Sequence, residues 1–162
     1  MGLDNATKKS GFAIKENGKL IHRGLVTSSN SDMMQRIEEM YLQIKCVVEE
    51  YHVDYIGFEN TTFSSNIDTL KGLSFLAGSI FALCVEKDLG CRILFPSEWR
   101  KNFGFKGKER KLLKQQAIEY VNAKYGLDYV YDQKDKNGHD DICEAICICD
   151  AMEIILQEQK EI

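Results

Sequence analysis

The chain has 162 residues, of which 44% are hydrophobic and 28% charged, the balance of one globular domain spanning residues 1–162. Its single proline, Pro96, argues against a proline-rich linker, and no apolar run reaches the roughly 18 residues that a membrane helix needs, so no membrane partner is expected. Asp4, Lys8 and Lys9 interrupt any signal-peptide core, which predicts a cytoplasmic protein, and the net charge of −4, taken alone, argues against nucleic acid as a partner.

The N-terminal third of the chain predicts three strands and a helix. Asn17 and Gly18 favour a hairpin turn between the second and third strands. Asn30 or Ser31 can cap a helix that runs to about Tyr51, because apolar residues recur there at helical spacing. The three strands are expected at residues 1–4, 10–15 and 19–26.

The rest of the chain alternates helices and strands before it becomes helical. Glu59 ends the fourth predicted strand, Pro96 stops the fifth, and Ser97 is the expected N-cap of a short helix. A hairpin followed by β-α-β units predicts a mixed five-stranded sheet with helices on both faces. The expected elements are strands at 54–58 and 91–95 and helices at 66–87, 97–103, 108–125 and 140–159.

The cysteines predict free thiols rather than disulfides. Most of them lie in apolar stretches and no CxxC pair is present, a pattern typical of buried thiols. The alternative is a zinc site made of His139, Cys143 and Cys147, for which no fourth ligand has suitable spacing. The six residues are Cys46, Cys84, Cys91, Cys143, Cys147 and Cys149.

A basic segment stands out against the acidic chain. It holds seven basic residues and one acid, Glu109, so it carries a charge of +6 and leaves −10 on the rest. Such a patch can bind phosphates on an acidic protein, although a solvated helix face has the same composition. Its basic residues are Arg100, Lys101, Lys106, Lys108, Arg110, Lys111 and Lys114.

Acidic residues lie at the ends of predicted elements. Asp4 follows the first strand and Glu59 ends the fourth. Asp141 and Glu144 are three residues apart on one face of the last helix, directly after Asp140. Each acid has a plain structural interpretation, as a turn or helix cap, a solvated strand end or a surface residue.

Taken together, these carboxylates predict a metal site at one edge of the sheet. Carboxylates at buried strand ends are costly unless they are paired or bind a metal. Oxygen-only ligands suit Mg²⁺, with Mn²⁺ able to substitute. Two such ions about 4 Å apart can activate water and stabilise the leaving oxygen in phosphodiester hydrolysis.

Three segments resemble the motifs of RuvC-type Holliday junction resolvases. GLDNATKKSGFAI resembles their opening GxDxxxxxxG motif, and IGFENTTFSSN resembles their second motif, a strand that ends in glutamate. HDDICEAICICDA resembles the last motif, the start of a helix with the pattern D-x-x-D/E. The resemblance spans residues 1 to about 155, and its overall character is that of the phage-encoded, RuvC-like branch.

The resemblance implies an RNase H-like fold, a homodimer, and paired nicks in opposing strands of four-way DNA junctions. It carries the metal-binding and catalytic roles over to Asp4, Glu59, Asp141 and Glu144. Glu144 stands where aspartate is commoner in bacterial members. Asp140 is an additional acid, which we expect beside the metal ligands rather than among them.

The resemblance also gives roles to residues outside the carboxylates. Arg100 and Lys111 fall roughly where the family has functional lysines, in a stretch whose basic side chains flank the active site. Phe63 corresponds to an aromatic that stacks on a base at the junction centre, or else it packs into the core. His139 is either a proton shuttle near the metal or a capping residue.

Other functions use the same carboxylates. A flap nuclease or a nuclease acting on RNA–DNA hybrids would share the fold, and a junction-binding protein with little cutting would lack part of the acid set, which is complete here. An actin-like phosphotransferase needs two such domains, more than 162 residues supply. The small and apolar residues of the 66–87 helix exceed what one face needs to cover a sheet, so some of them are expected to contact a second subunit. They are Leu70, Leu73, Leu76, Ala77, Ile80, Phe81 and Cys84. The sequence leaves open whether the chain works with a branch-migration complex.

Overall fold

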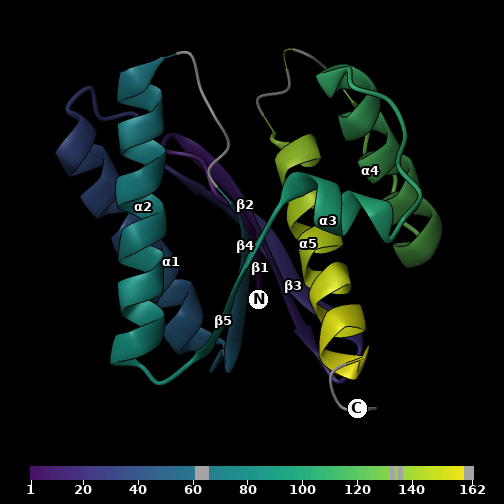
Figure 1. Cartoon of the computed structure of the whole chain (residues 1–162), viewed down its shortest axis with the longest axis horizontal. Helices are drawn as coiled ribbons and strands as arrows, with labels where there is room; N and C mark the ends of the chain where they lie inside the picture. The colour runs from purple at the N-terminus through teal and green to yellow at the C-terminus, as the bar shows by residue number, and fades with distance from the viewer. Residues whose placement is uncertain (61–65, 132–133, 135–136, 159–162) are drawn as a thin grey trace.

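The computed structural model describes residues 1–60, 66–131, 134 and 137–158. Its centre is a five-stranded sheet in the order β3-β2-β1-β4-β5 (Figure 1). β1 pairs antiparallel with β2 and parallel with β4, which confirms the predicted mixed sheet. The strands are β1 (Gly2–Asp4), β2 (Lys9–Glu16), β3 (Lys19–Thr27), β4 (Tyr55–Glu59) and β5 (Gly90–Leu94).

Helices cover both faces of the sheet, as predicted. One face packs against α1 and α2 in a core that includes Leu3 and Phe58 (Figure 1). The other face packs against α5, on which α3 and α4 lie, in a core around Trp99 and Ile146. The helices are α1 (Met33–Glu50), α2 (Ile67–Glu86), α3 (Pro96–Lys101), α4 (Arg110–Tyr125) and α5 (His139–Glu158).

Glycines allow α5 to lie directly on the sheet. A Cβ atom on Gly2 would collide with the backbone oxygen of Ala145, and one on Gly11 would collide with the backbone of Asp141. Because both obstacles are backbone atoms, no side-chain rotation could relieve the overlap. These close approaches fix the N-terminal half of α5 over β1 and β2.

A buried carboxylate ties α5 to its neighbours. Asp150 is 1% exposed. It accepts hydrogen bonds from Lys15 of β2 at 2.6 Å and from Tyr125 of α4, also at 2.6 Å. Tyr120 and Lys124 of α4 donate to its other oxygen at 2.9 and 3.0 Å. This network holds α4 against α5, because a buried charge is stable only when it is paired.

Two predicted helix caps were wrong. Asp32, not Asn30 or Ser31, caps α1 by accepting a hydrogen bond from the Gln35 amide at 2.9 Å. α3 starts at Pro96, one residue before the predicted cap Ser97, because proline at the first helical position needs no hydrogen-bond partner for its nitrogen. The hairpin turn was correctly placed, since the two residues after Glu16 both have positive φ.

The cysteines are free thiols in the described part of the chain. Four of them are buried, as predicted, whereas Cys91 is half-buried and Cys46 is exposed. Cys143 and Cys147 belong to the core between α5 and the sheet, and burial raises the pKa of both thiols. The His/Cys/Asp/Glu group that the described residues offer to a metal contains neither cysteine, which argues against the zinc alternative.

α2 alone among the described helices is long and apolar enough, by length and composition, to cross a membrane. Asp68, Lys71 and Glu86 interrupt its apolar sequence, so an uninterrupted apolar run of roughly 18 residues is not present in it. Leu76, Ile80 and Leu83 of α2 are fully buried in the core between α1 and the sheet. The core helix of a globular domain has the same composition.

Candidate active site

Two strand ends and one helix start meet at one edge of the sheet. Asp4 is the last residue of β1, and Glu59 is the last residue of β4. The two strands are parallel and Leu3 pairs with Phe58, so the acids leave the sheet side by side. The N-terminal turns of α5 add Asp141 and Glu144, which the contact between Gly11 and Asp141 holds beside β2.

Three of the four predicted ligands converge. One carboxylate oxygen from each of Asp4, Asp141 and Glu144 can be chosen so that all three lie within 4.8 Å of one another. Asp141 and Glu144 are buried, and Asp4 is half-buried. Glu59 lies beside this group, where its Oε1 accepts a hydrogen bond from Trp99 Nε1 at 3.0 Å.

Crowding of like charges perturbs these acids. Burial, then the neighbouring Glu144, Glu59 and Asp141, raise the pKa of Asp4 well above its usual value. Burial raises the pKa of Glu144, with Lys114 opposing the rise and Glu59 adding to it. A divalent cation bound near Asp4 would therefore offset negative charge in the cluster.

Three cationic side chains surround the acids. Lys114 of α4 is 6% exposed, pairs with Asp140, and lies 3.0 Å from Asp141 Oδ1. Lys9 of β2 lies 3.0 Å from Asp141 Oδ2. Nη2 of Arg100 lies 3.2 Å from Glu144 Oε1 and 3.6 Å from Glu59 Oε1.

The sequence patterns did not place Lys9 or Lys114 at the carboxylates. Lys114 was counted with the DNA-binding patch, yet it shares the buried face of α4 with Ala117, Ile118 and Val121. That spacing of three, four and seven residues was the available signal. The signal for Lys9 was weaker: it is the first residue of the strand that contains Gly11.

The rest of the basic segment lies on the surface. Arg100 is at the carboxylates, as expected of a residue that flanks the site, but Lys111 lines a separate hollow on α4 with Gln115 and Tyr131. The exposed members are Lys101, Lys106, Lys108, Arg110 and Lys111.

Of the other predicted site residues, one lies at the carboxylate cluster and another packs against an aromatic ring. Asp140 lies beside the cluster and pairs with Lys114. His139 packs its ring 4.4 Å from the ring of Tyr129. Phe63 lies outside the described residues.

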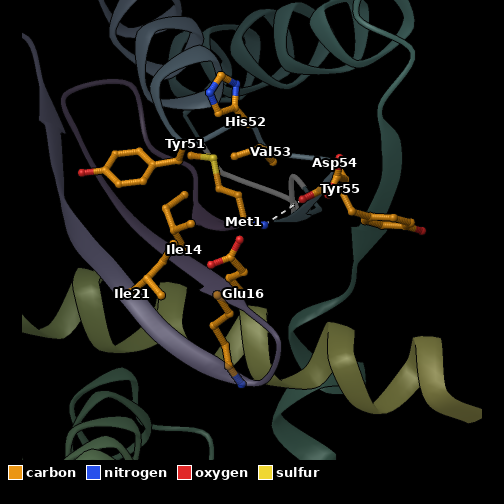
Figure 2. Close-up of a pocket in the computed structure, with 10 residues that line it drawn as sticks. Met1, Ile14, Glu16, Ile21, Tyr51, His52, Val53, Asp54 and Tyr55 are labelled. Carbon is orange, nitrogen blue, oxygen red and sulfur yellow. Dashed lines mark hydrogen bonds between the residues drawn. The ribbon is translucent and has the colours of Figure 1, made fainter.

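A second hollow lies at the opposite end of the sheet. Figure 2 shows it around Met1 and Tyr55, at the starts of the two strands whose other ends carry Asp4 and Glu59. The Met1 amino group donates a hydrogen bond to the Tyr55 carbonyl at 2.7 Å. Its lining contains none of the predicted site residues.

Comparisons with known proteins agree on one family. The family model described as crossover junction endodeoxyribonuclease RuvC matches residues 1–148. The RuvC of Dictyoglomus thermophilum is 24% identical over 154 residues, which cover 92% of each chain. The RuvC of Geotalea uraniireducens is 28% identical over 96 residues, which are 52% of this chain and 56% of that protein.

Solved structures share the fold. Thermus thermophilus RuvC in complex with a Holliday junction substrate matches 97% of this chain and 94% of that chain, with a TM-score of 0.75 and 12% identity. The yeast mitochondrial Holliday junction resolvase Ydc2 matches 93% of this chain and 75% of that chain, with a TM-score of 0.55 and 16% identity. These likenesses confirm the RNase H-like fold.

Proposed function

The chain belongs to the RuvC family of crossover junction endodeoxyribonucleases, and we propose that it cuts four-way DNA junctions by hydrolysing phosphodiester bonds. The convergence of Asp4, Asp141 and Glu144 within 4.8 Å carries this proposal. It places acidic ligands at the edge of a fold shared with a RuvC that was solved on a Holliday junction. Glu59 completes the set from the neighbouring strand end.

Magnesium is the cofactor that this ligand set fits best. Asp4, Glu59, Asp141 and Glu144 offer only oxygen atoms, which favour Mg²⁺ and allow Mn²⁺. The raised pKa of Asp4 supports this assignment, because burial is its largest cause and the neighbouring carboxylates of Glu144, Glu59 and Asp141 add to it. When bound, the ion lowers the pKa of a water molecule and offsets charge on the scissile phosphate.

The chain's own residues orient this chemistry. The Trp99 indole holds Glu59 at 3.0 Å and fixes where that carboxylate points. Arg100, whose side chain is 23% exposed, bridges Glu59 and Glu144 and can turn one N–H group towards a phosphate oxygen. Arg100 therefore contacts the acids of the site and also faces the solvent, from which DNA would bind.

The exposed basic residues of the segment from Arg100 to Lys111 would bind the DNA backbone. Phosphate contacts position a duplex without reading its sequence, which suits an enzyme that recognises the shape of a branch. Lys101 and Lys106 line a hollow with Arg100, so this surface continues into the acidic cluster. A base-stacking role for Phe63 stays a prediction.

A homodimer would let two sites cut two strands. α2 exposes Phe75, Phe81 and Val85, whose residue exposures are 46%, 52% and 68%. An isologous contact through this face would bury them and relate the two active sites by a dyad. The two sites could then nick opposed strands of a four-way junction symmetrically.

We place this activity in the cytoplasm, that of the host if the gene is carried by a phage. The phage-encoded branch stays a prediction from the character of the sequence.

Cleavage of a four-way junction, a 5′ flap and an RNA–DNA hybrid, assayed side by side with and without Mg²⁺, tests the proposal. We expect Mg²⁺-dependent cuts in two opposed strands of the junction. Preferred cutting of the flap or hybrid would replace the proposal by a different nuclease of the same fold. Junction binding without cutting at any Mg²⁺ concentration would make the chain a binding protein.

A further inference from the structure

Both oxygens of Asp141 are already engaged by ammonium groups. Lys114 Nζ lies 3.0 Å from Oδ1, and Lys9 Nζ lies 3.0 Å from Oδ2. Lys114 also pairs with Asp140 and lies 3.7 Å from Glu144 Oε2. A divalent cation on this side of Asp141 would have to displace one of the two lysines.

Asp4 has the opposite surroundings. The ion pairs among the described residues at this site involve Asp140, Asp141, Glu144 and Glu59 but not Asp4, on which Lys114 acts only at longer range. One oxygen of Asp4 nevertheless lies within 4.8 Å of oxygens of Asp141 and Glu144. Ammonium groups therefore lie beside Asp141, whereas none of them pairs with Asp4. The site is asymmetric before any ion binds.

The charge balance leaves room for a divalent ion. Five carboxylates, those of Asp4, Glu59, Asp140, Asp141 and Glu144, contribute five negative charges. Three cations paired with them, Lys9, Arg100 and Lys114, contribute three positive charges. When all five acids are ionised, these three paired cations therefore leave part of the negative charge of the cluster uncompensated, which a divalent cation can offset.

Lys114 is held in place rather than swinging in from solvent. It is 6% exposed, and its helix α4 is tied to α5 through Tyr120, Lys124 and Tyr125, which donate hydrogen bonds to Asp150. Asp140 gives its ammonium group a further partner that lies outside the converging acids. Withdrawing this lysine would leave a buried charge unpaired, which is costly.

We propose that Lys9 and Lys114 take the place of the second of two divalent cations, so that the site binds a single ion at Asp4 and Glu144. This inference rests on the proposed function, and it revises the two-metal arrangement expected from the sequence. The ammonium groups offset negative charge beside Asp141 that a second ion would otherwise offset. Asp140 is a positioning residue that holds Lys114, which explains the additional acid.

Counting bound Mn²⁺ tests the inference without any measurement of cleavage. Titration of the chain, alone and bound to a junction with uncleavable linkages, followed by the electron paramagnetic resonance signal of Mn²⁺, should give one ion at each site with an uncoupled spectrum in both states. Asp4→Asn should remove that ion. Two ions per wild-type chain with a spin-coupled spectrum would overturn the inference, whereas the absence of any Mn²⁺ binding would instead undermine the proposed function.

Removing the lysines should create the second site. Lys9→Met combined with Lys114→Met keeps the side-chain length and removes two positive charges, so the count should rise from one Mn²⁺ to two. The matched control is Lys8→Met with Lys111→Met, exposed lysines next to or one turn from the first pair, which should leave the count at one. If the double variant does not fold, Lys114→Met alone serves, with a second, weaker Mn²⁺ expected. A count of one in every folded lysine variant would contradict the inference.

Discussion

Gly11 of β2 and Asp141 of α5 touch through their backbones, and there is no space between them for a Cβ atom. The contact sets the height of α5 above the sheet at the point where Asp141 joins Asp4. A residue with no side chain of its own thus decides whether the carboxylates meet.

Gly11→Ala should displace the start of α5. Overpacking of this kind costs about 1–3 kcal/mol of stability, and we expect both a lower denaturation midpoint and a large loss of cleavage. Chemical denaturation and junction assays measure the two effects. Unchanged cleavage by Gly11→Ala would show that the contact does not position the site.

Trp99 should report on the site, because it is the only tryptophan of the chain and donates to Glu59. Adding Mg²⁺ should change its fluorescence in the wild type and change it much less in Glu59→Gln. Trp99→Phe removes the donor while keeping an aromatic ring, and we expect about a tenfold loss of cleavage, the effect of roughly 1.4 kcal/mol in a barrier. Wild-type cleavage by Trp99→Phe would mean that the hydrogen bond does not orient Glu59.

Asp4 should destabilise the metal-free protein at neutral pH. Its folded pKa lies above the unfolded value of 3.8, so the unfolded chain releases the proton first as the pH rises. The stability cost therefore begins near pH 3.8, grows until the folded pKa is passed, and persists at pH 7. Asp4→Asn should raise the melting temperature of metal-free protein at pH 7 and have little effect near pH 3.8.

Magnesium provides the complementary half of that experiment. The ion should raise the melting temperature of the wild type at pH 7, because it binds only the folded state. It should do so much less in Asp4→Asn. A variant that melts below the wild type in the absence of metal would contradict the assigned pKa shift.

The exposed face of α2 should hold the dimer together. Phe81→Glu places a charge where an apolar contact is proposed, so sedimentation equilibrium should show the mass falling towards the monomer value of 18.5 kDa. Leu42→Glu, on an exposed residue of α1, is the matched control and should remain dimeric. A wild type that is monomeric with and without junction DNA would remove the dimer and favour a nuclease that cuts single strands.

Much of this site could be predicted from the sequence because its acids lie at the ends of regular elements. Asp4 and Glu59 end strands, and the i, i+3 spacing of Asp141 and Glu144 places them on one helix face, so local patterns were enough. Lys9 and Lys114 depend on which elements pack together, and that information is not local. The position of Lys114 on the buried face of α4 indicated burial but not its partners. The cap at Asp32 was missed because Asn30 and Ser31 have about the same capping propensity. The start of α3 at Pro96 was missed because the residue before it, Phe95, is not a usual capping residue.

Glu59→Gln tests most directly whether the four carboxylates carry out the cutting of DNA junctions. The substitution removes one negative charge and keeps the side-chain size, while every basic residue that would bind phosphates stays in place. We predict that Glu59→Gln binds a synthetic four-way junction with nearly wild-type affinity in Ca²⁺ and fails to cut it in Mg²⁺, while the wild type nicks two opposed strands. Wild-type cutting by Glu59→Gln would contradict the account.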